Sequence, residues 1–105
     1  MSTLNEVQTE VVRQITRDYG DVVTTHLQSN VMLGLAEEAG EVAGLMKRVL
    51  RNFPRDRERI TREYFVEELG DVLWYLAACC ATQGIDLEEI WQYNKTKLKE
   101  RYENE

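Results

Sequence analysis

Cysteine, proline and histidine are scarce in this chain of 105 residues, which has two, one and one of them respectively. The two cysteines, Cys79 and Cys80, are adjacent within an apolar run, so they cannot form a disulfide framework and are interpreted as core residues. No apolar run reaches the roughly 20 residues that span a bilayer, and the N-terminus has neither the basic nor the apolar segment of a secretory signal. We therefore expect one cytoplasmic domain over residues 1–105, with no membrane partner.

Positive charge is also in deficit. The formal net charge of -6 argues against a nucleic-acid partner bound through bulk charge. The exception is the segment from Lys47 to Arg62, which holds seven of the 13 basic residues. We interpret this segment as a solvated connector or interface rim; the alternative is a positive rim that attracts a polyanionic ligand or the acidic surface of another subunit.

The apolar residues recur at helical spacing, and no stretch alternates as a strand does. A capping-box pattern at Thr3 and Glu6 starts the first helix, and the second must stop near Pro54. Gly84 suits a left-handed helix end, and Asp86 can cap the helix that follows. The sequence therefore predicts an all-α protein of four helices, near residues 4–18, 28–52, 58–83 and 87–102.

Two of these helices carry the same six-residue phrase, Glu-Glu-x-Gly-acid-Val, at residues 37–42 and 67–72. At about 100° per residue, Glu38 and Glu68 lie in the middle of the apolar stripes of their helices. Glu41 and Asp71 lie about 60° to one side, whereas the leading glutamates of both phrases lie about 100° away and are expected at the rim. Four carboxylates are thus predicted to face the interior or its edge.

Carboxylates in an apolar stripe are costly unless something compensates their charge. Salt bridges are one alternative, but the core-facing positions of these helices contain no Lys or Arg. Protonation, or exposure of a helix pair that packs differently, also remains open. We favour a divalent cation. Neither phrase contains the histidine that di-iron helical proteins use, and an oxygen-only site suits Mg²⁺ or Mn²⁺, which points to phosphate chemistry.

The acidic pairs Glu38-x-x-Glu41 and Glu68-x-x-Asp71, the run Gly84-Ile85-Asp86-Leu87 and the pattern Asn94-x-x-Lys97-x-x-x-Arg101 stand in this order. Over about residues 27–102 the chain resembles the MazG-type all-α nucleoside triphosphate pyrophosphohydrolases. The resemblance implies a four-helix MazG-like bundle completed by oligomerisation into homodimers or homotetramers. It also implies that Glu38, Glu41, Glu68 and Asp71 coordinate Mg²⁺, and that a nucleoside triphosphate is hydrolysed to monophosphate and pyrophosphate.

His26 and Asn30 resemble the residues that contact the nucleoside in dCTP-preferring house-cleaning members, and we expect them near the base or sugar. The alternative for both residues is a capping or connector role. Relatives that hydrolyse dUTP or phosphoribosyl-ATP share the acidic motifs, so the resemblance leaves the preferred base open.

The fourth helix supplies candidate phosphate ligands. Asn94 falls in its apolar stripe, and Lys97 and Arg101 flank that stripe, where they are expected to bind phosphate oxygens. The alternative for these cations is a solvated basic face, which we prefer for Lys95 and Lys99.

The two aromatic residues after the second acidic phrase have different expected places. Trp74 lies away from the acids and is interpreted as a packing or subunit-interface residue. Tyr75 is expected to pack under the acids or line a base pocket. Because the third helix is apolar over a wide arc, we expect neighbouring subunits to bury part of it.

The predicted reaction is Mg²⁺-dependent hydrolysis of a nucleoside triphosphate between its α- and β-phosphates. We expect the enzyme to act in house-cleaning of the nucleotide pool. Glu38, Glu68 and Asp71 act chiefly as ligands, and Glu41, at the edge of the stripe, assists the attacking water. Lys97 and Arg101 stabilise the leaving pyrophosphate. The alternative function is a non-catalytic helical oligomer that uses the same acidic helices as a partner surface.

Overall fold

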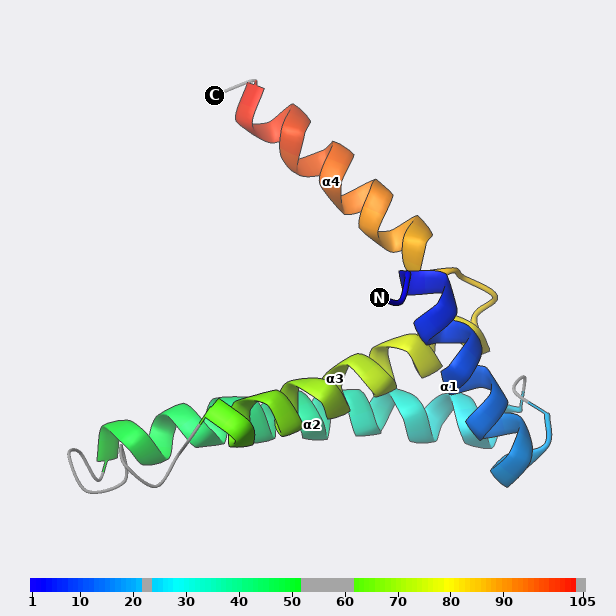
Figure 1. The fold of residues 1–105 in the computed structure, drawn as a ribbon, viewed down its shortest axis with the longest axis horizontal. Coiled ribbons are helices and arrows are strands. Elements are labelled where there is room, and N and C mark those ends of the chain that lie inside the picture. The colour runs from blue at the N-terminus through cyan, green and yellow to red at the C-terminus, as the bar shows by residue number, and fades with distance from the viewer. Residues whose placement is uncertain (22–23, 52–61, 104–105) are drawn as a thin grey trace.

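The computed structural model of the chain describes residues 1–21, 24–51 and 62–103 and is built from four helices (Figure 1). These are α1 (Leu4–Tyr19), α2 (Thr25–Arg51), α3 (Arg62–Thr82) and α4 (Leu87–Glu103). Within these ranges there is no strand, which confirms the all-α prediction. None of the helices in the described ranges is both long and apolar enough to cross a membrane.

Helices α2 and α3 form the most extensive helix–helix contact described in the molecule. The two helices run antiparallel side by side, and α1 crosses them where α2 begins and α3 ends (Figure 1). The buried core lies at this crossing and draws on all four helices: Val11, Ile15, Leu27, Val31, Ala77, Ala78, Cys80 and Leu87. Cys80 is buried and Cys79 half-buried, as expected of core cysteines.

Helix starts follow local capping. The Thr3 hydroxyl accepts a hydrogen bond from the Glu6 N–H at 3.1 Å, and the Glu6 carboxylate accepts one from the Thr3 N–H at 3.2 Å, so the predicted capping box is present. Helix α2 begins at Thr25, three residues before the predicted start. The reason is that the Thr24 hydroxyl accepts the Leu27 N–H at 3.2 Å, a capping interaction that the apolar pattern does not indicate.

The turn between α3 and α4 has the predicted glycine-ended form. Gly84 adopts φ +67°, and the Ile85 N–H donates to the Cys80 carbonyl at 2.9 Å, closing the last turn of α3. The carbonyl of Asp86 then accepts a hydrogen bond from the Glu89 N–H at 3.0 Å as α4 begins. The predicted start of the third helix at residue 58 lies outside the described residues, and α3 is described from Arg62.

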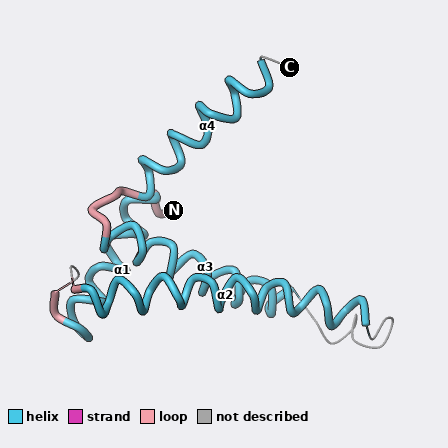
Figure 2. The backbone as a smooth tube through the Cα atoms, turned by 180° about the vertical axis from the view of Figure 1, so that it is seen from behind, coloured by secondary structure: helices cyan, strands magenta, loops and turns pink. Residues whose placement is uncertain are grey.

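Helix α4 leaves the other three helices. Both views show it projecting from the crossing of α1 and α3, clear of the long arm of α2 and α3 (Figures 1 and 2). Only its first turns are anchored, by buried Leu87 and by Ile90 packed against the core. Farther along, Tyr93 and Tyr102 are more than two-thirds exposed. A single chain thus packs three helices and the base of the fourth.

One close contact joins α2 to α3 at the edge of the core. The ring of Tyr75 lies so near Gly34 that a Cβ atom there would overlap it. Tyr75 also meets the ring of Trp74 edge to face, with ring centroids 5.1 Å apart. Gly34 is therefore needed for the approach of α3, not for an unusual backbone conformation.

We expect Gly34→Ala to lower the free energy of unfolding by about 1–3 kcal/mol, because the added methyl group must displace a packed aromatic ring. Gly44→Ala is the matched control, since nothing lies within 4 Å of its missing Cβ. That change should stabilise helix α2 by about 0.5–1 kcal/mol. Urea denaturation followed by circular dichroism measures both; equal effects of the two changes would contradict the role given to Gly34.

Candidate metal centre

The two acidic phrases meet where α2 and α3 pack together. Carboxylate oxygens of Glu38, Glu68 and Asp71 lie within 4.8 Å of one another. Those of Glu37, Glu38 and Glu41 form a second group within the same limit, and Glu38 belongs to both. The predicted four acids are thus brought to one place, and Glu37, which the helical projection assigned to the rim, has a carboxylate beside them.

Burial differs among these acids in the way the projection predicts. Glu38 and Glu68 are half-buried, whereas Glu37, Glu41 and Asp71 are exposed. One oxygen of each half-buried acid, Oε2 of Glu38 and Oε2 of Glu68, is fully buried without a hydrogen-bond partner among the described residues. Buried acceptors of this kind need either a proton or a cation.

The crowding raises pKa values. Burial, a hydrogen bond with Glu41 and repulsion from Glu41, Asp71 and Glu68 together raise the pKa of Glu38 to about 7. The pKa of Glu68 is also raised, first by its hydrogen bond with Glu41 and then by burial and by repulsion from its acidic neighbours. Near neutral pH, protons and metal cations therefore compete for the carboxylates of this cluster.

Salt bridges do not compensate the cluster within the part of the chain that the structure describes. The ion pairs there join Arg13 to Glu10, Arg17 to Asp18 and Lys99 to Glu103, all at exposed positions outside the acidic phrases. The donor set is made of carboxylates alone, half-buried and with two unpartnered oxygens, and it fits a hard divalent cation such as Mg²⁺ or Mn²⁺.

The two aromatic residues after Asp71 have separate roles. Trp74 donates its Nε1–H to the Gln14 side-chain oxygen at 2.8 Å and packs against the core, so its predicted packing role is confirmed. Tyr75 is half-buried against α2, and burial, followed by repulsion from the Glu38 carboxylate, raises the pKa of its hydroxyl. Tyr75 thus borders the acidic cluster.

His26 and Asn30 are exposed in the first two turns of α2. Asn30 lies two helical turns, about 12 Å, before Glu38, and the structure does not bring either residue into the carboxylate groups. Both lie on the helix that carries Glu38, toward its N-terminus.

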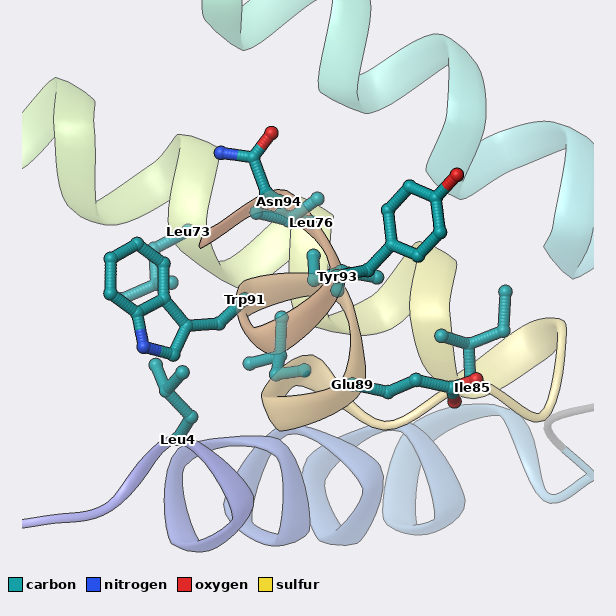
Figure 3. A pocket seen from close by; sticks show the side chains of 10 residues that line it. Leu4, Leu73, Leu76, Ile85, Glu89, Trp91, Tyr93 and Asn94 are labelled. Carbon is teal, nitrogen blue, oxygen red and sulfur yellow. The ribbon is translucent and has the colours of Figure 1, made fainter. Parts of the chain in front are cut away.

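The predicted phosphate ligands of α4 are separate from the acids within one chain. Lys97 and Arg101 are exposed on the projecting part of the helix. Half-buried Asn94 lines a mostly apolar cavity of about 570 Å³ in the angle between α3 and α4 (Figure 3). In this view Trp91 lies above Leu4 of α1, and Asn94 points away from α1. Helix α4, which carries Lys97 and Arg101, thus projects away from α2 and α3 of its own chain (Figure 1).

Of the basic segment, Lys47 and Arg48 at the end of α2 and Arg62 at the start of α3 are exposed. Residues 52–61 of this segment lie outside the described residues. The prediction that the segment is a rim without a nucleic-acid role stays a prediction.

Comparison with known proteins defines the class. Residues 26–105 match the MazG nucleotide pyrophosphohydrolase domain, and the chain belongs to this family. Among its relatives, the Gene 37 protein of Mycobacterium phage L5 is 35% identical over 82 residues, covering 78% of this chain and 72% of the phage protein. The protein YvdC of Bacillus subtilis is 32% identical over 75 residues, covering 67% and 71% of the two chains. No solved structure matches the chain.

The raised pKa of Glu38 predicts a pH-dependent stability. Without divalent cations the folded protein holds this proton more tightly than the unfolded chain, whose pKa is near 4.5. The stabilisation is present below that value and is lost as the pH rises toward 7. We expect the thermal midpoint to fall by a few degrees between pH 5 and pH 8, and Mg²⁺ to restore it at pH 8.

Differential scanning calorimetry in the presence of a chelator measures this dependence. In Glu38→Gln the fall should be smaller, and Mg²⁺ should have little effect. Glu100→Gln, which changes an exposed acid of α4, should behave as the wild type. A Glu38→Gln protein with an unaltered pH profile would contradict the prediction.

Proposed function

We propose that this chain is a divalent-cation-dependent nucleoside triphosphate pyrophosphohydrolase that cleaves between the α- and β-phosphates, acting in the cytoplasm on the nucleotide pool. The observation that carries the proposal is the meeting of the two acidic phrases, with buried, unpartnered oxygens on Glu38 and Glu68, in a member of the MazG family. Glu38, Glu41, Glu68 and Asp71 would hold the cation. When bound, Mg²⁺ or Mn²⁺ supplies neutralisation of the triphosphate charge and activation of water.

Glu41 is the proposed base. It is exposed, so water and substrate reach it, and its carboxylate lies beside those of Glu37 and Glu38. As the water oxygen attacks the α-phosphorus, its proton passes to the Glu41 carboxylate. The bond from the α-phosphorus to the bridging oxygen breaks, and pyrophosphate leaves with that oxygen. No covalent intermediate on the protein is required.

The nucleoside is proposed to lie toward the N-terminal part of α2. His26 and Asn30 offer exposed polar groups there, and the ring of Tyr75 lies between these first turns and the acids, against Gly34. A nucleotide whose α-phosphate is at Glu38 would extend its sugar and base over this surface. We propose deoxynucleoside triphosphates as the preferred substrates and assign no preferred base.

A second copy of this chain is proposed to complete the site. Lys97 and Arg101 are exposed residues of α4, the helix that projects away from α2 and α3 (Figure 1), yet four carboxylates and a triphosphate need positively charged side chains nearby. The C-terminal half of α4 is rich in lysine and arginine, complementary to the acidic face of α2 and α3. Exposed apolar residues Val66, Leu69 and Leu73 on α3 and Trp91 on α4 give such a dimer an apolar surface to bury.

The binding-module alternative uses the same helices without chemistry. It predicts that the acids are replaceable by amides without loss of function and that no nucleotide is consumed. The unpartnered buried oxygens favour the enzyme, because a partner surface gains nothing from half-buried like charges held 4.8 Å apart or less.

Activity is tested by assaying pyrophosphate release from a panel of deoxynucleotides and ribonucleotides with Mg²⁺. We expect Glu38→Gln and Asp71→Asn to lower kcat/KM by more than the roughly 10–100-fold typical of residues that only orient metal ligands. Glu100→Gln should retain wild-type rates. Release of orthophosphate with a nucleoside diphosphate would contradict cleavage at the α-phosphate, and full activity in either cluster variant would contradict the site.

The shared site is tested by mixing two impaired variants, Asp71→Asn and Arg101→Ala, after partial unfolding and reassociation. If α4 serves the partner's acids, half of the dimers are mixed and each has one intact site, so about a quarter of the wild-type activity returns. If Arg101 serves its own chain, every site remains damaged and no activity returns. Mixing each variant with itself is the control.

A further inference from the structure

Gln8 makes an unusual pair of contacts from α1 to the turn before α4. It is a buried polar residue, 8% exposed, on a helix that lies outside the region matched to the family. Its side-chain Nε2 donates to the Ile85 carbonyl at 2.7 Å, and its Oε1 accepts the Leu87 N–H at 2.9 Å. One amide thus holds both ends of a three-residue segment that is almost 80 positions away in the sequence.

The Leu87 N–H is a group that α4 itself cannot satisfy. Leu87 is the first residue of the helix, and the first four N–H groups of a helix have no partner within it. Most helices are capped by a residue of their own chain segment, whereas here the acceptor comes from another helix. The cap therefore ties the position of α4 to α1 as well as satisfying a buried donor.

Few other contacts fix the direction of α4. Leu87 and Ile90 reach the core, and Leu4 of α1 lies under Trp91 at the apolar cavity (Figure 3). Beyond this base the helix projects (Figure 1). Fourteen residues separate Leu87 from Arg101, which is about 21 Å of helix, so a tilt of about 10° at the base moves Arg101 by about 4 Å.

We infer that Gln8 is a positioning residue for the site: its double hydrogen bond sets the direction of α4 and so delivers Asn94, Lys97 and Arg101 to the triphosphate. This inference rests on the proposed function, in which the side chains of Lys97 and Arg101 bind the triphosphate. Gln8 contacts no substrate atom in it and acts only through α4. Displacements of a few ångström are large on the scale of catalytic positioning, where about 1 Å costs about 100-fold in rate.

The first variant is Gln8→Leu, which keeps most of the side-chain volume and removes both hydrogen bonds. Gln14→Leu is the matched control, because Gln14 is on the same helix, is half-buried and accepts a hydrogen bond from Trp74 of α3, away from the turn. Hydrogen exchange followed by mass spectrometry should show faster exchange in the first turns of α4 for Gln8→Leu alone. Mn²⁺ affinity without nucleotide should be unchanged in both, since the acids lie on α2 and α3.

The activity arm uses a double-variant cycle. We expect Gln8→Leu to lower kcat by about 100-fold and Gln14→Leu by less than about threefold. In a background that carries Asn94→Ala, Lys97→Ala and Arg101→Ala together, Gln8→Leu should cost little more, because Gln8 acts on the substrate only through these three residues. Multiplicative losses in this combined variant, or equal losses in Gln8→Leu and Gln14→Leu, would overturn the inference.

If Gln8→Leu does not fold, Gln8→Glu replaces it. The glutamate keeps the acceptor for the Leu87 N–H and loses the donor to the Ile85 carbonyl, so an intermediate loss of rate is expected. A wild-type protein that hydrolyses no nucleotide would refute the proposed function but not this contact, and hydrogen exchange alone would then decide whether Gln8 fixes α4. Unaltered exchange in α4 of Gln8→Leu would overturn the inference in either case.

Discussion

Repulsion among carboxylates between α2 and α3 is the constraint around which the molecule is arranged. Glu38 and Glu68 each bury one oxygen with no partner in the described chain, and the pKa values of both are raised. Packing the two helices this way costs free energy in the absence of a counter-charge. The helices nevertheless meet, because the core at the crossing with α1 and the contact of Tyr75 with Gly34 hold them together. Stability gained at one end supports unfavourable electrostatics farther along the pair, as is common at functional sites.

Most of the helical architecture and the place of the acids could be predicted from the sequence. Apolar periodicity places Glu38 and Glu68 in the stripe, and two phrases of the same pattern on adjacent helices indicate that they meet. Periodicity describes one helix at a time, however. It gives no angle between helices, and so it could not show that α4 projects away with Lys97 and Arg101. The start of α2 was misplaced for a similar reason, since the Thr24 cap is a single side-chain contact outside the apolar pattern.

Gln8 illustrates a second limit. Gln8 lies in the apolar stripe of its helix with Val11 and Ile15, a pattern that indicates a polar residue facing the core. Only the fold shows that its partners are Ile85 and Leu87. Glu37 is a lesser case, because helical projection gives the direction of a side chain but not its reach. The partners of such long-range polar contacts carry no local pattern, and they are the part of the site that sequence reasoning missed.

The core of the chain is gathered at one end of the long helix pair, among Leu27, Val31, Ala77 and Ala78, and beyond it Leu45 is the one buried apolar side chain described on α2. Local opening free energies should therefore decline along the pair from the crossing toward its far end, with the acids between the two regimes. A ligand bound at the acids would therefore stabilise the turns of α2 and α3 that lie beyond them, away from the core. Ligand binding and the ordering of these outer turns would then be thermodynamically coupled.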